Sequence, residues 1–349
     1  MFKSFVIYTL PSDFKLFDSL DPSVLQQKRS KPLTGHSTES LGWAEPLNDG
    51  SLFLQCEQDY VFKIEKIYKR VAKSTLKAAV AQKLSELAAD EPNKWGPKAK
   101  ITKESREAIK LAVHQLLISK TLTQFKNSYL VYSPSLHMLI VEATTDNYAE
   151  DVVSLLRDTF GSVKAKPLEI KRTPSQTFTE WLTNENSVPE EFELLDAGLV
   201  MVSTHKNGNR VTYNAQTMNS EEISANLLAN KKPLKIDLSW DLTLSFSLDE
   251  HLKFTKVKMH KALRERIKSA HELASGKKAE SLAEIMEKER AKVKSQISLL
   301  RLSLVKMLPL LLAGLGEHND THTRKCDENL VHDQSGEIEA VINQFEEQE

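Results

Sequence analysis

Residues 232–258 constrain the fold of this chain more than any other stretch. Apolar and polar side chains alternate along residues 234–240 and again along residues 242–248. A period of two residues turns one face of a strand toward a core and the other toward water, which is typical of antiparallel sheets. We therefore predict a half-buried antiparallel meander with a third strand over residues 252–257. The joins lack the glycine that two-residue hairpins favour, so the turn type stays open.

The third strand departs from the alternation at its end. Counted from Leu252 and Phe254, Lys256 and Lys258 would point toward the core. Either the strand runs past the edge of the core, or a bulge reverses the phase. Lysines in this position usually protect a sheet edge, and they can also contact a polyanion. Lys253, Lys256 and Lys258 are therefore candidate DNA-binding residues.

The composition is typical of a globular protein, with 40% hydrophobic and 27% charged residues. A length of 349 residues allows one to three domains. The two cysteines, Cys56 and Cys326, lie far apart and predict a reducing compartment without a disulfide framework. We expect no signal peptide. The apolar segment 302–315 is too short to span a bilayer, and it contains Lys306 and Pro309.

The net charge of −1 hides an asymmetry along the chain. Residues 317–349 carry ten acidic and two basic residues, a net charge of −8, which leaves +7 for the rest. We predict that this acidic tail is disordered. A basic body is a hint of contact with nucleic acid.

Residues 66–126 predict a protruding helical hairpin with basic faces. The basic residues from Lys66 to Lys77 have the spacing of one helix face. Apolar residues further along occupy nearly the same angular sector of the helix, so the helix is bent or begins after Lys66. A turn containing Pro92 and Gly96 follows, and Thr102 is the predicted N-cap of the second helix. Phosphates attract lysine and arginine whatever the base sequence, although most charged stripes are only solvated surfaces. The candidate DNA-binding residues here are Lys66, Lys69, Arg70, Lys73, Lys77, Lys98, Lys100 and Lys103.

A long helical segment follows the meander. Ser281 and Glu284 form a capping box. Apolar residues then recur at a 4-3-4-3-4 spacing, which predicts a seam that packs helix on helix, within the chain or across a dimer. The seam consists of Val293, Ile297, Leu300, Leu304, Met307 and Leu311.

The fold class is therefore α+β, with mixed or antiparallel sheets. We expect an N-terminal sheet part (1–65), a basic helical hairpin (66–126), a central α+β part (127–258), C-terminal helices (259–316) and the acidic tail (317–349). Residues 31–49 read as a loop, in which Trp43 is expected to fill a core rather than to stack on a base.

No pattern in the sequence predicts an active site, a cofactor or a metal site. Glycine-rich phosphate loops and paired-cysteine motifs are absent. Asp158 with Glu169 and Lys171 has only the outline of a metal-dependent nuclease motif. The tail residues that could gather a metal lie in a polar segment, and they are His318, His322, Cys326 and His332. We predict a protein that is not an enzyme.

Several short motifs occur in the order in which they are found in the recombination-associated protein RdgC family of bacteria. They are Gly42-Trp43 with Pro46, Leu155-Leu156-Arg157 before Gly161-Ser162, Pro167-Leu168, Thr179-Glu180-Trp181, Phe192 with Leu194-Leu195-Asp196, Ser220-Glu221-Glu222-Ile223, Leu238 with Trp240, Leu252-Lys253 and Gly314-Leu315-Gly316. The chain resembles this family over about residues 1–316.

The resemblance implies a non-enzymatic protein that binds double-stranded DNA with little sequence preference. It implies a homodimer closed into a ring with a positively charged hole around the duplex, located in the cytoplasm on the nucleoid. It also implies restraint of a RecA-type recombinase through occupation of the DNA.

Individual positions carry part of the resemblance. Gln216 matches a position near DNA or the gate of the ring. Leu122, in a segment that includes Phe125, matches a phenylalanine that closes the ring, so both are candidate dimer contacts. Leucine keeps apolar contact there but loses ring stacking. Asn214 and Ala215 stand where family members tend to carry lysines.

Two other classes of function stay open. One is a recombination scaffold that recruits partners through the helical seam and the acidic tail, with incidental DNA contact. The other is a metal-dependent nuclease. Salt-dependent binding to random duplex DNA distinguishes a DNA-binding protein from a scaffold, and Mg²⁺-dependent cleavage identifies a nuclease.

Overall fold

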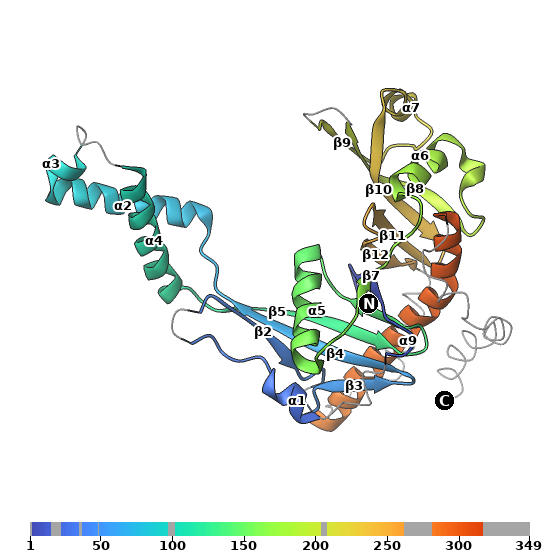
Figure 1. The fold of residues 1–349 in the computed structure, drawn as a ribbon, viewed down its shortest axis with the longest axis horizontal. Helices are drawn as coiled ribbons and strands as arrows, with labels where there is room; N and C mark the ends of the chain where they lie inside the picture. The colour runs from blue at the N-terminus through green and yellow to red at the C-terminus, as the bar shows by residue number, and fades with distance from the viewer. Residues whose placement is uncertain are drawn as a thin grey trace. The chain divides into compact units, whose positions relative to one another are not determined.

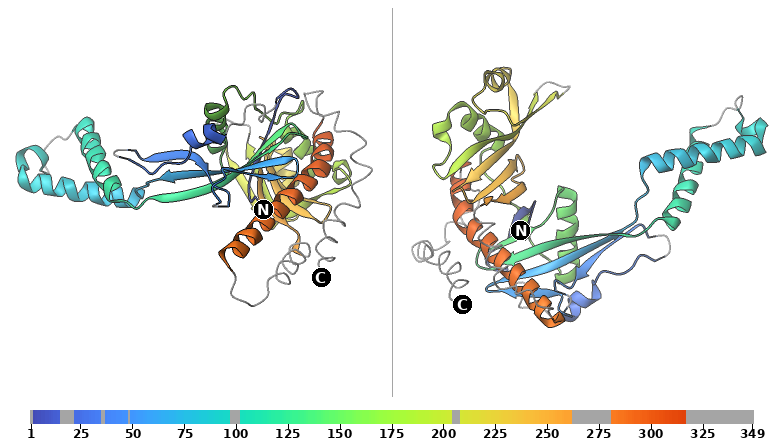
Figure 2. Two further views of the ribbon diagram at one scale, coloured as in Figure 1. Left: turned by 90° about the horizontal axis from the view of Figure 1, so that it is seen from below. Right: turned by 180° about the vertical axis from the view of Figure 1, so that it is seen from behind.

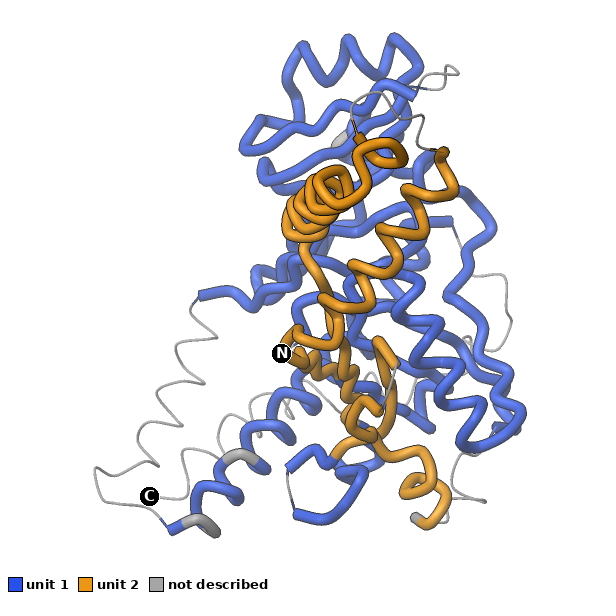
Figure 3. Tube along the Cα trace, turned by 90° about the vertical axis from the view of Figure 1, so that its left-hand side faces the viewer, with its two compact units in different colours: residues 1–20, 45–62, 129–349 blue, residues 21–44, 63–128 orange. Residues whose placement is uncertain are grey.

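The computed structural model of the chain describes residues 2–14, 22–34, 37–47, 49–96, 102–203, 208–261 and 281–316. These residues form an α+β fold with two sheets (Figure 1). The chain divides into two compact units (Figure 3). Unit 1 comprises residues 1–20, 45–62 and 129–349, and unit 2 comprises residues 21–44 and 63–128.

The first sheet has seven strands in the described residues, and all the pairings between its strands given below are antiparallel. Its order is β2-β4-β5-β6-β1-β7, and β3 pairs with β4. The strands are β1 (Val6–Thr9), β2 (Glu39–Ala44), β3 (Phe53–Cys56), β4 (Asp59–Tyr68), β5 (Gln124–Ser133), β6 (Met138–Val141) and β7 (Lys166–Pro167).

The second sheet, in unit 1, contains the predicted meander. Its order is β12-β11-β10-β8-β9, and the strands are β8 (Phe192–Ser203), β9 (Arg210–Asn214), β10 (Lys231–Trp240), β11 (Leu244–Asp249) and β12 (Phe254–Met259). The meander β10–β11–β12 is confirmed, with one change. Asp241 and Leu242 both have positive φ and form the turn, so Leu242 is exposed instead of beginning a strand. Two positive φ values in succession are the signature of a type I′ turn.

A bulge in β12 explains the lysines that the alternation placed on the core side. Ser245 pairs with Lys258, but Ser247 pairs with Thr255, so β12 takes three steps where β11 takes two. Lys256 is the extra residue and has a φ of 54°. The bulge lets Phe254 and Val257 both enter the core, while Lys256 and Lys258 face solvent.

The described helices flank these sheets or lie in the sequence between their strands (Figures 1 and 2). They are α1 (Pro22–Gln27), α2 (Lys73–Asp90), α3 (Pro92–Trp95), α4 (Lys103–Lys120), α5 (Asp146–Phe160), α6 (Pro174–Thr183), the 3₁₀ helix η2 (Glu185–Ser187), α7 (Glu221–Leu228) and α9 (Leu282–Gly314). Thr102, Thr145 and Ser281 cap the N-termini of α4, α5 and α9 with their side chains, and the predicted capping box at Ser281 is present.

The predicted loop over residues 31–49 is wrong in its second half. Residues 39–44 form β2, and Trp43 is fully buried there, as a core residue should be. Backbone bonds join Trp43 to the α1 exit: Ser30 N donates to Trp43 O (2.9 Å), and Trp43 N donates to Lys28 O (3.0 Å). A Cβ on Gly42 would lie 2.5 Å from Ser30 N. Glycine before Trp43 is therefore what lets the two backbones meet.

The apolar seam of α9 packs within its own chain, against strands of both sheets and against α6. Ile297, Leu300, Leu304, Met307 and Leu311 are buried in one cluster that also contains strand and α6 residues, such as Val61, Leu238 and Trp181. The prediction of a seam that packs helix on helix within the chain is confirmed for α6 and is incomplete, because the same face also packs on strands. The spacing identified a buried helix face correctly, but it does not distinguish a partner helix from a sheet.

The end of α9 explains the Gly314-Leu315-Gly316 motif. A Cβ on Gly314 would lie 2.4 Å from Pro189 Cγ, so only glycine fits there without a shift. Gly316 has a φ of 102°, which favours glycine. Leu315 between them is fully buried, and its carbonyl oxygen accepts a hydrogen bond from Thr177 Oγ1 of α6 (3.4 Å). The motif therefore fixes α9 against α6.

The N-terminal run joins the two sheets within unit 1. β1 pairs with β6 and β7 of the first sheet. Just before it, Phe5 exchanges backbone hydrogen bonds with Phe254 of β12 (2.9 and 3.0 Å), and the two rings stack 4.7 Å apart. Val257 N also donates to Lys3 O (3.0 Å). One short segment is therefore shared by both sheets.

Candidate nucleic-acid interface

The basic stripe predicted over residues 66–77 is not one helix face. β4 continues to Tyr68 because Ile64 and Ile67 are buried and the strand pairs with β2, so α2 begins only at Lys73. Lys66 therefore lies in β4, where its Nζ is 3.0 Å from Glu39 Oε2. Lys69 and Arg70 lie in the connection to α2. Only Lys73 and Lys77 of the stripe belong to the helix.

The part of the stripe that remains lies on the exposed side of α2. Lys73 and Lys77 are one turn apart and exposed, whereas the apolar residues Leu76, Val80 and Leu84 are half-buried. α2 and α4 contact each other in unit 2. On α4, the exposed cations Lys103, Arg106 and Lys110 recur at helical spacing. Lys98 and Lys100 lie outside the described residues.

These helices bury very little. Among the residues of α2 and α4, Val113 alone is buried. Large apolar side chains stay exposed on α4, just after it and at the start of β5. Leu111 and Leu116 of α4 are exposed, Leu122 is 85% exposed, and Phe125 of β5 is 62% exposed. A group of exposed large apolar residues in one small region of a protein marks an interaction surface.

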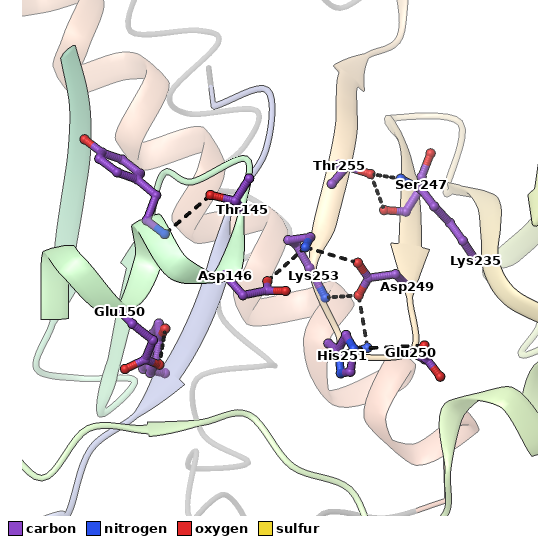
Figure 4. Close-up of polar contacts among 12 residues, drawn as sticks. Thr145, Asp146, Glu150, Lys235, Ser247, Asp249, Glu250, His251, Lys253 and Thr255 are labelled. Carbon is purple, nitrogen blue, oxygen red and sulfur yellow. Dashed lines mark hydrogen bonds and ion pairs between the residues drawn. The ribbon is translucent and has the colours of Figure 1, made fainter. Parts of the chain in front are cut away.

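The meander lysines have partners within unit 1. Lys253 Nζ lies 2.9 Å from Asp146 Oδ1, in the first turn of α5, and 3.5 Å from Asp249 Oδ2 (Figure 4). Its side chain is only 13% exposed. Burial works to lower the pKa of Lys253, but the hydrogen bond to Asp146 and the charge of Asp249 outweigh it and hold that pKa above its usual range. Lys253 thus fastens α5 to the β11–β12 turn.

Lys256 and Lys258 differ from Lys253 in exposure. Lys256 Nζ is 3.3 Å from Asp237 Oδ2, which is buried in β10. A Cβ on Gly198 of β8 would lie 2.8 Å from that same oxygen, so Gly198 leaves the room that the pair occupies. Lys256 and Lys258 both point to solvent. The exposed edge of the meander therefore presents two of the three candidate lysines.

Gln216 is oriented by α7. Its Nε2 donates to Ser220 Oγ (3.3 Å) and to Glu222 Oε2 (3.4 Å) at the start of that helix. The preceding Ala215 has a φ of 53°, which turns the chain sharply before Gln216. Both donors of the amide group thus have acceptors at the start of α7. The motif Ser220-Glu221-Glu222 therefore has a structural role next to Gln216.

No local sequence pattern predicts the charged cluster around Arg301 of α9. Arg301 lies 3.3 Å from Glu57 Oε2 and 3.6 Å from Asp59 Oδ2, on either side of the β3–β4 turn. Asp59 is 1% exposed and accepts a hydrogen bond from Ser133 Oγ (2.7 Å). These residues are so far apart in the chain that no local pattern connects them.

The described residues contain no group of three or more His, Cys, Asp or Glu side chains placed to hold a metal ion. Asp158, Glu169 and Lys171 are all exposed. The tail residues His318, His322, Cys326 and His332 lie outside the described residues. α9 is long and apolar enough, by length and composition alone, to cross a membrane, and its seam is buried against the rest of unit 1.

Comparisons with known proteins agree on one family. A family model described as "Putative exonuclease, RdgC" matches residues 1–318. The Recombination-associated protein RdgC of Pseudomonas aeruginosa PAO1 is 26% identical over 320 residues, which cover 90% of this chain and 97% of that protein. The protein of the same name from Tolumonas auensis is 27% identical over 318 residues, covering 90% of this chain and 98% of that protein.

Proposed function

Because the chain belongs to the RdgC family of recombination-associated proteins, we propose that it is a double-stranded DNA-binding protein without sequence preference. Its helices α2 and α4 would form a basic helical hairpin that contacts the phosphates. By occupying the duplex it would limit the activity of a RecA-type recombinase. This places its work on the nucleoid, in the cytoplasm.

The observation that carries the proposal is the set of exposed cations on two helices that bury almost nothing. Lys73 and Lys77 on α2, with Lys103, Arg106 and Lys110 on α4, face solvent. Long helices with a single buried residue contribute little to a core of their own. Cations on such helices bind the regularly spaced charges of a backbone and not individual bases.

We further propose that a second copy of the chain completes the binding surface as a closed ring dimer. Leu122 and Phe125 are the expected contact, and Leu111 and Leu116 extend the exposed apolar surface. Leu122→Asp should weaken the dimer, because closure would bury an unpaired carboxylate. Light scattering at micromolar concentration measures the mass. A variant that keeps the wild-type mass would show that Leu122 is not part of the dimer contact.

The test of DNA binding is affinity for two unrelated duplexes of equal length over a range of salt concentrations. The proposal expects equal affinities and a steep linear fall of log affinity with log salt. A strong preference for one sequence, or an affinity that does not depend on salt, would contradict it. Adding the protein to a recombinase strand-exchange reaction then tests the restraint, which should grow with occupancy of the duplex.

The word exonuclease in the description of the family model supports a second candidate. A nuclease would shorten end-labelled duplex in the presence of Mg²⁺, and EDTA would stop the reaction. A protein that binds duplex but leaves its length unchanged would retain the first proposal. A scaffold would bind neither duplex in a salt-dependent way, yet it would retain a protein partner.

A further inference from the structure

The N-terminal half of α9 is held to unit 1 differently from its C-terminal half. From Leu300 to Leu315 the helix buries one apolar side chain after another. Before Leu300, Ile297 is its one buried residue among those described, and Ile285 is exposed. A cavity of about 60 Å³ lies under this part, lined by Phe2, Tyr129, Val293, Gln296, Ile297 and Leu300. Apolar packing thus fastens the end of α9 and leaves its beginning loosely covered.

Charged contacts hold the helix at its beginning, through Arg290, and near its middle, through Ser298 and Arg301. Arg290 Nη2 lies 2.8 Å from Asp49 Oδ2. Ser298 Oγ donates to Glu57 Oε1 (2.9 Å), and Arg301 bonds Glu57 and lies near Asp59. Arg301 Nη2 also donates to Ser135 Oγ (3.3 Å). Arg301 therefore connects α9 with the β3–β4 turn, with the start of β4 and with the β5–β6 turn.

Part of this cluster is strained or under-satisfied. Glu57 has a φ of 55°, a region that non-glycine residues rarely occupy. Arg301 Nε is buried and has no hydrogen-bond partner. Burial outweighs the Ser133 hydrogen bond and the Arg301 charge, so the pKa of Asp59 is raised. Lifting α9 would bring water to Arg301 Nε and to Asp59, which offsets part of the lost contacts, whereas the φ of Glu57 belongs to the β3–β4 turn and would not change.

We propose that Arg301 is the centre of a charge latch, and that α9 from its N-terminus to Arg301, with Ile297 and Leu300, lifts from the β3–β4 turn while the rest of the protein stays folded. The latch comprises Arg301, Glu57, Asp59 and Ser298. Cys56 provides a natural reporter, because it is buried next to α9 in the same core cluster. Burial raises the pKa of its thiol to about 11, against the nearby charge of Lys294, so the closed form is unreactive.

The test is the rate at which an aromatic disulfide labels Cys56, in a Cys326→Ser background that removes the other thiol. Each rate is divided by that of the urea-unfolded protein at the same pH. Arg301→Met should raise the ratio on the order of 10- to 100-fold, the range expected for lost hydrogen bonds between charged groups. Lys292→Met removes an exposed charge from the same half of α9 and should leave the ratio unchanged.

Two further measurements decide between a local latch and global unfolding. Labelling through local opening changes little with low urea concentrations, because little surface is exposed, whereas global unfolding depends on urea steeply. Glu57→Gln, at an exposed turn position, should raise the ratio less than Arg301→Met does. It also tests the latch if Arg301→Met does not fold. Equal ratios in Arg301→Met and Lys292→Met, or a steep urea dependence in the wild type, would overturn the latch.

The pH dependence has a definite sign. The groups that face Asp59 are Ser133, Arg301 and Glu57, and Lys294 lies nearby beside Cys56. Opening removes both the burial that raises the pKa of Asp59 and the charge of Arg301 that lowers it. Because burial is the larger of the two effects, the closed form binds the proton more tightly than the open form does. Opening should therefore become rarer as the pH falls from neutrality through that pKa. Asp59→Asn should remove this dependence, and an unchanged profile would remove Asp59 from the latch.

Discussion

Lys73 and Lys77 offer the sharpest test of DNA contact. They are the two residues of the predicted basic stripe that lie on α2, one turn apart and exposed. If each neutralises one phosphate, the double variant Lys73→Ala/Lys77→Ala releases two fewer counterions on binding. Because each contact contributes about 0.9 to the slope of log affinity against log salt, the slope should become shallower by about 1.8.

The size of the effect follows from that slope. Between 50 and 200 mM salt, a slope difference of about 1.8 corresponds to a roughly 12-fold smaller loss of affinity in the variant. Fluorescence anisotropy with a labelled random duplex measures both slopes, and a second unrelated duplex should give the same values, because phosphates carry no sequence information. Circular dichroism must first show that both proteins are equally helical.

Lys83 on the same helix is the matched control. Its Nζ lies 3.1 Å from Glu86 Oε2, so its charge is already balanced within the chain. Lys83→Ala should keep the wild-type slope. Equal slopes of log affinity against log salt for the double variant and the wild type would refute DNA contact by α2. The exposed lysines Lys256 and Lys258 of β12 would then be the next candidates.

Three further predictions concern contacts that stabilise the fold, and urea unfolding measures each of them. Lys253→Met should lower the free energy of unfolding by about 1–3 kcal/mol, since it removes hydrogen bonds between charged groups. Because folding raises the pKa of Lys253, its contribution to the free energy of unfolding is complete below the ordinary pKa and is lost as the pH rises through the folded value. The stability difference between the variant and the wild type should therefore shrink at alkaline pH. A difference that does not depend on pH would contradict this role. Leu304→Ala should cost about 2–5 kcal/mol by leaving a cavity, and a cost below about 1 kcal/mol would mean that the seam is not core. Gly314→Ala should destabilise because its Cβ meets Pro189, whereas Gly50→Ala, at a position with nothing within 4 Å, tests backbone strain alone.

The sequence predicted features that depend on local periodicity. The meander followed from alternation, the N-caps from Thr102 and Ser281, and the buried face of α9 from its spacing. The helix face from Lys66 to Lys77 failed because five cations matched a helical period by chance, while strand pairing with β2 extended β4 through the same residues. Tertiary pairing decided between two local patterns.

Features that depend on distant residues could not be predicted. The alternation raised the question of a bulge in β12, but only the register with β11 answers it. Nothing local indicates that Lys253 meets Asp146, or that Arg301 meets Glu57 and Asp59. Gly42 and Gly314 were recognised as motif residues, and the reason for each is a neighbour from another part of the chain.

The bridge between Phe5 and Phe254 sets an order of events during synthesis. β1 gains β6 as a neighbour early, but Phe5 meets its partner only after residue 254 has been made, shortly before α9. At 5–20 residues per second, the delay is about 10 to 50 s. All residues of unit 2, by contrast, have been made once Ser128 has emerged. The nascent chain therefore cannot form this bridge until β12 has been made, so the connection between the two sheets of unit 1 is completed late in translation.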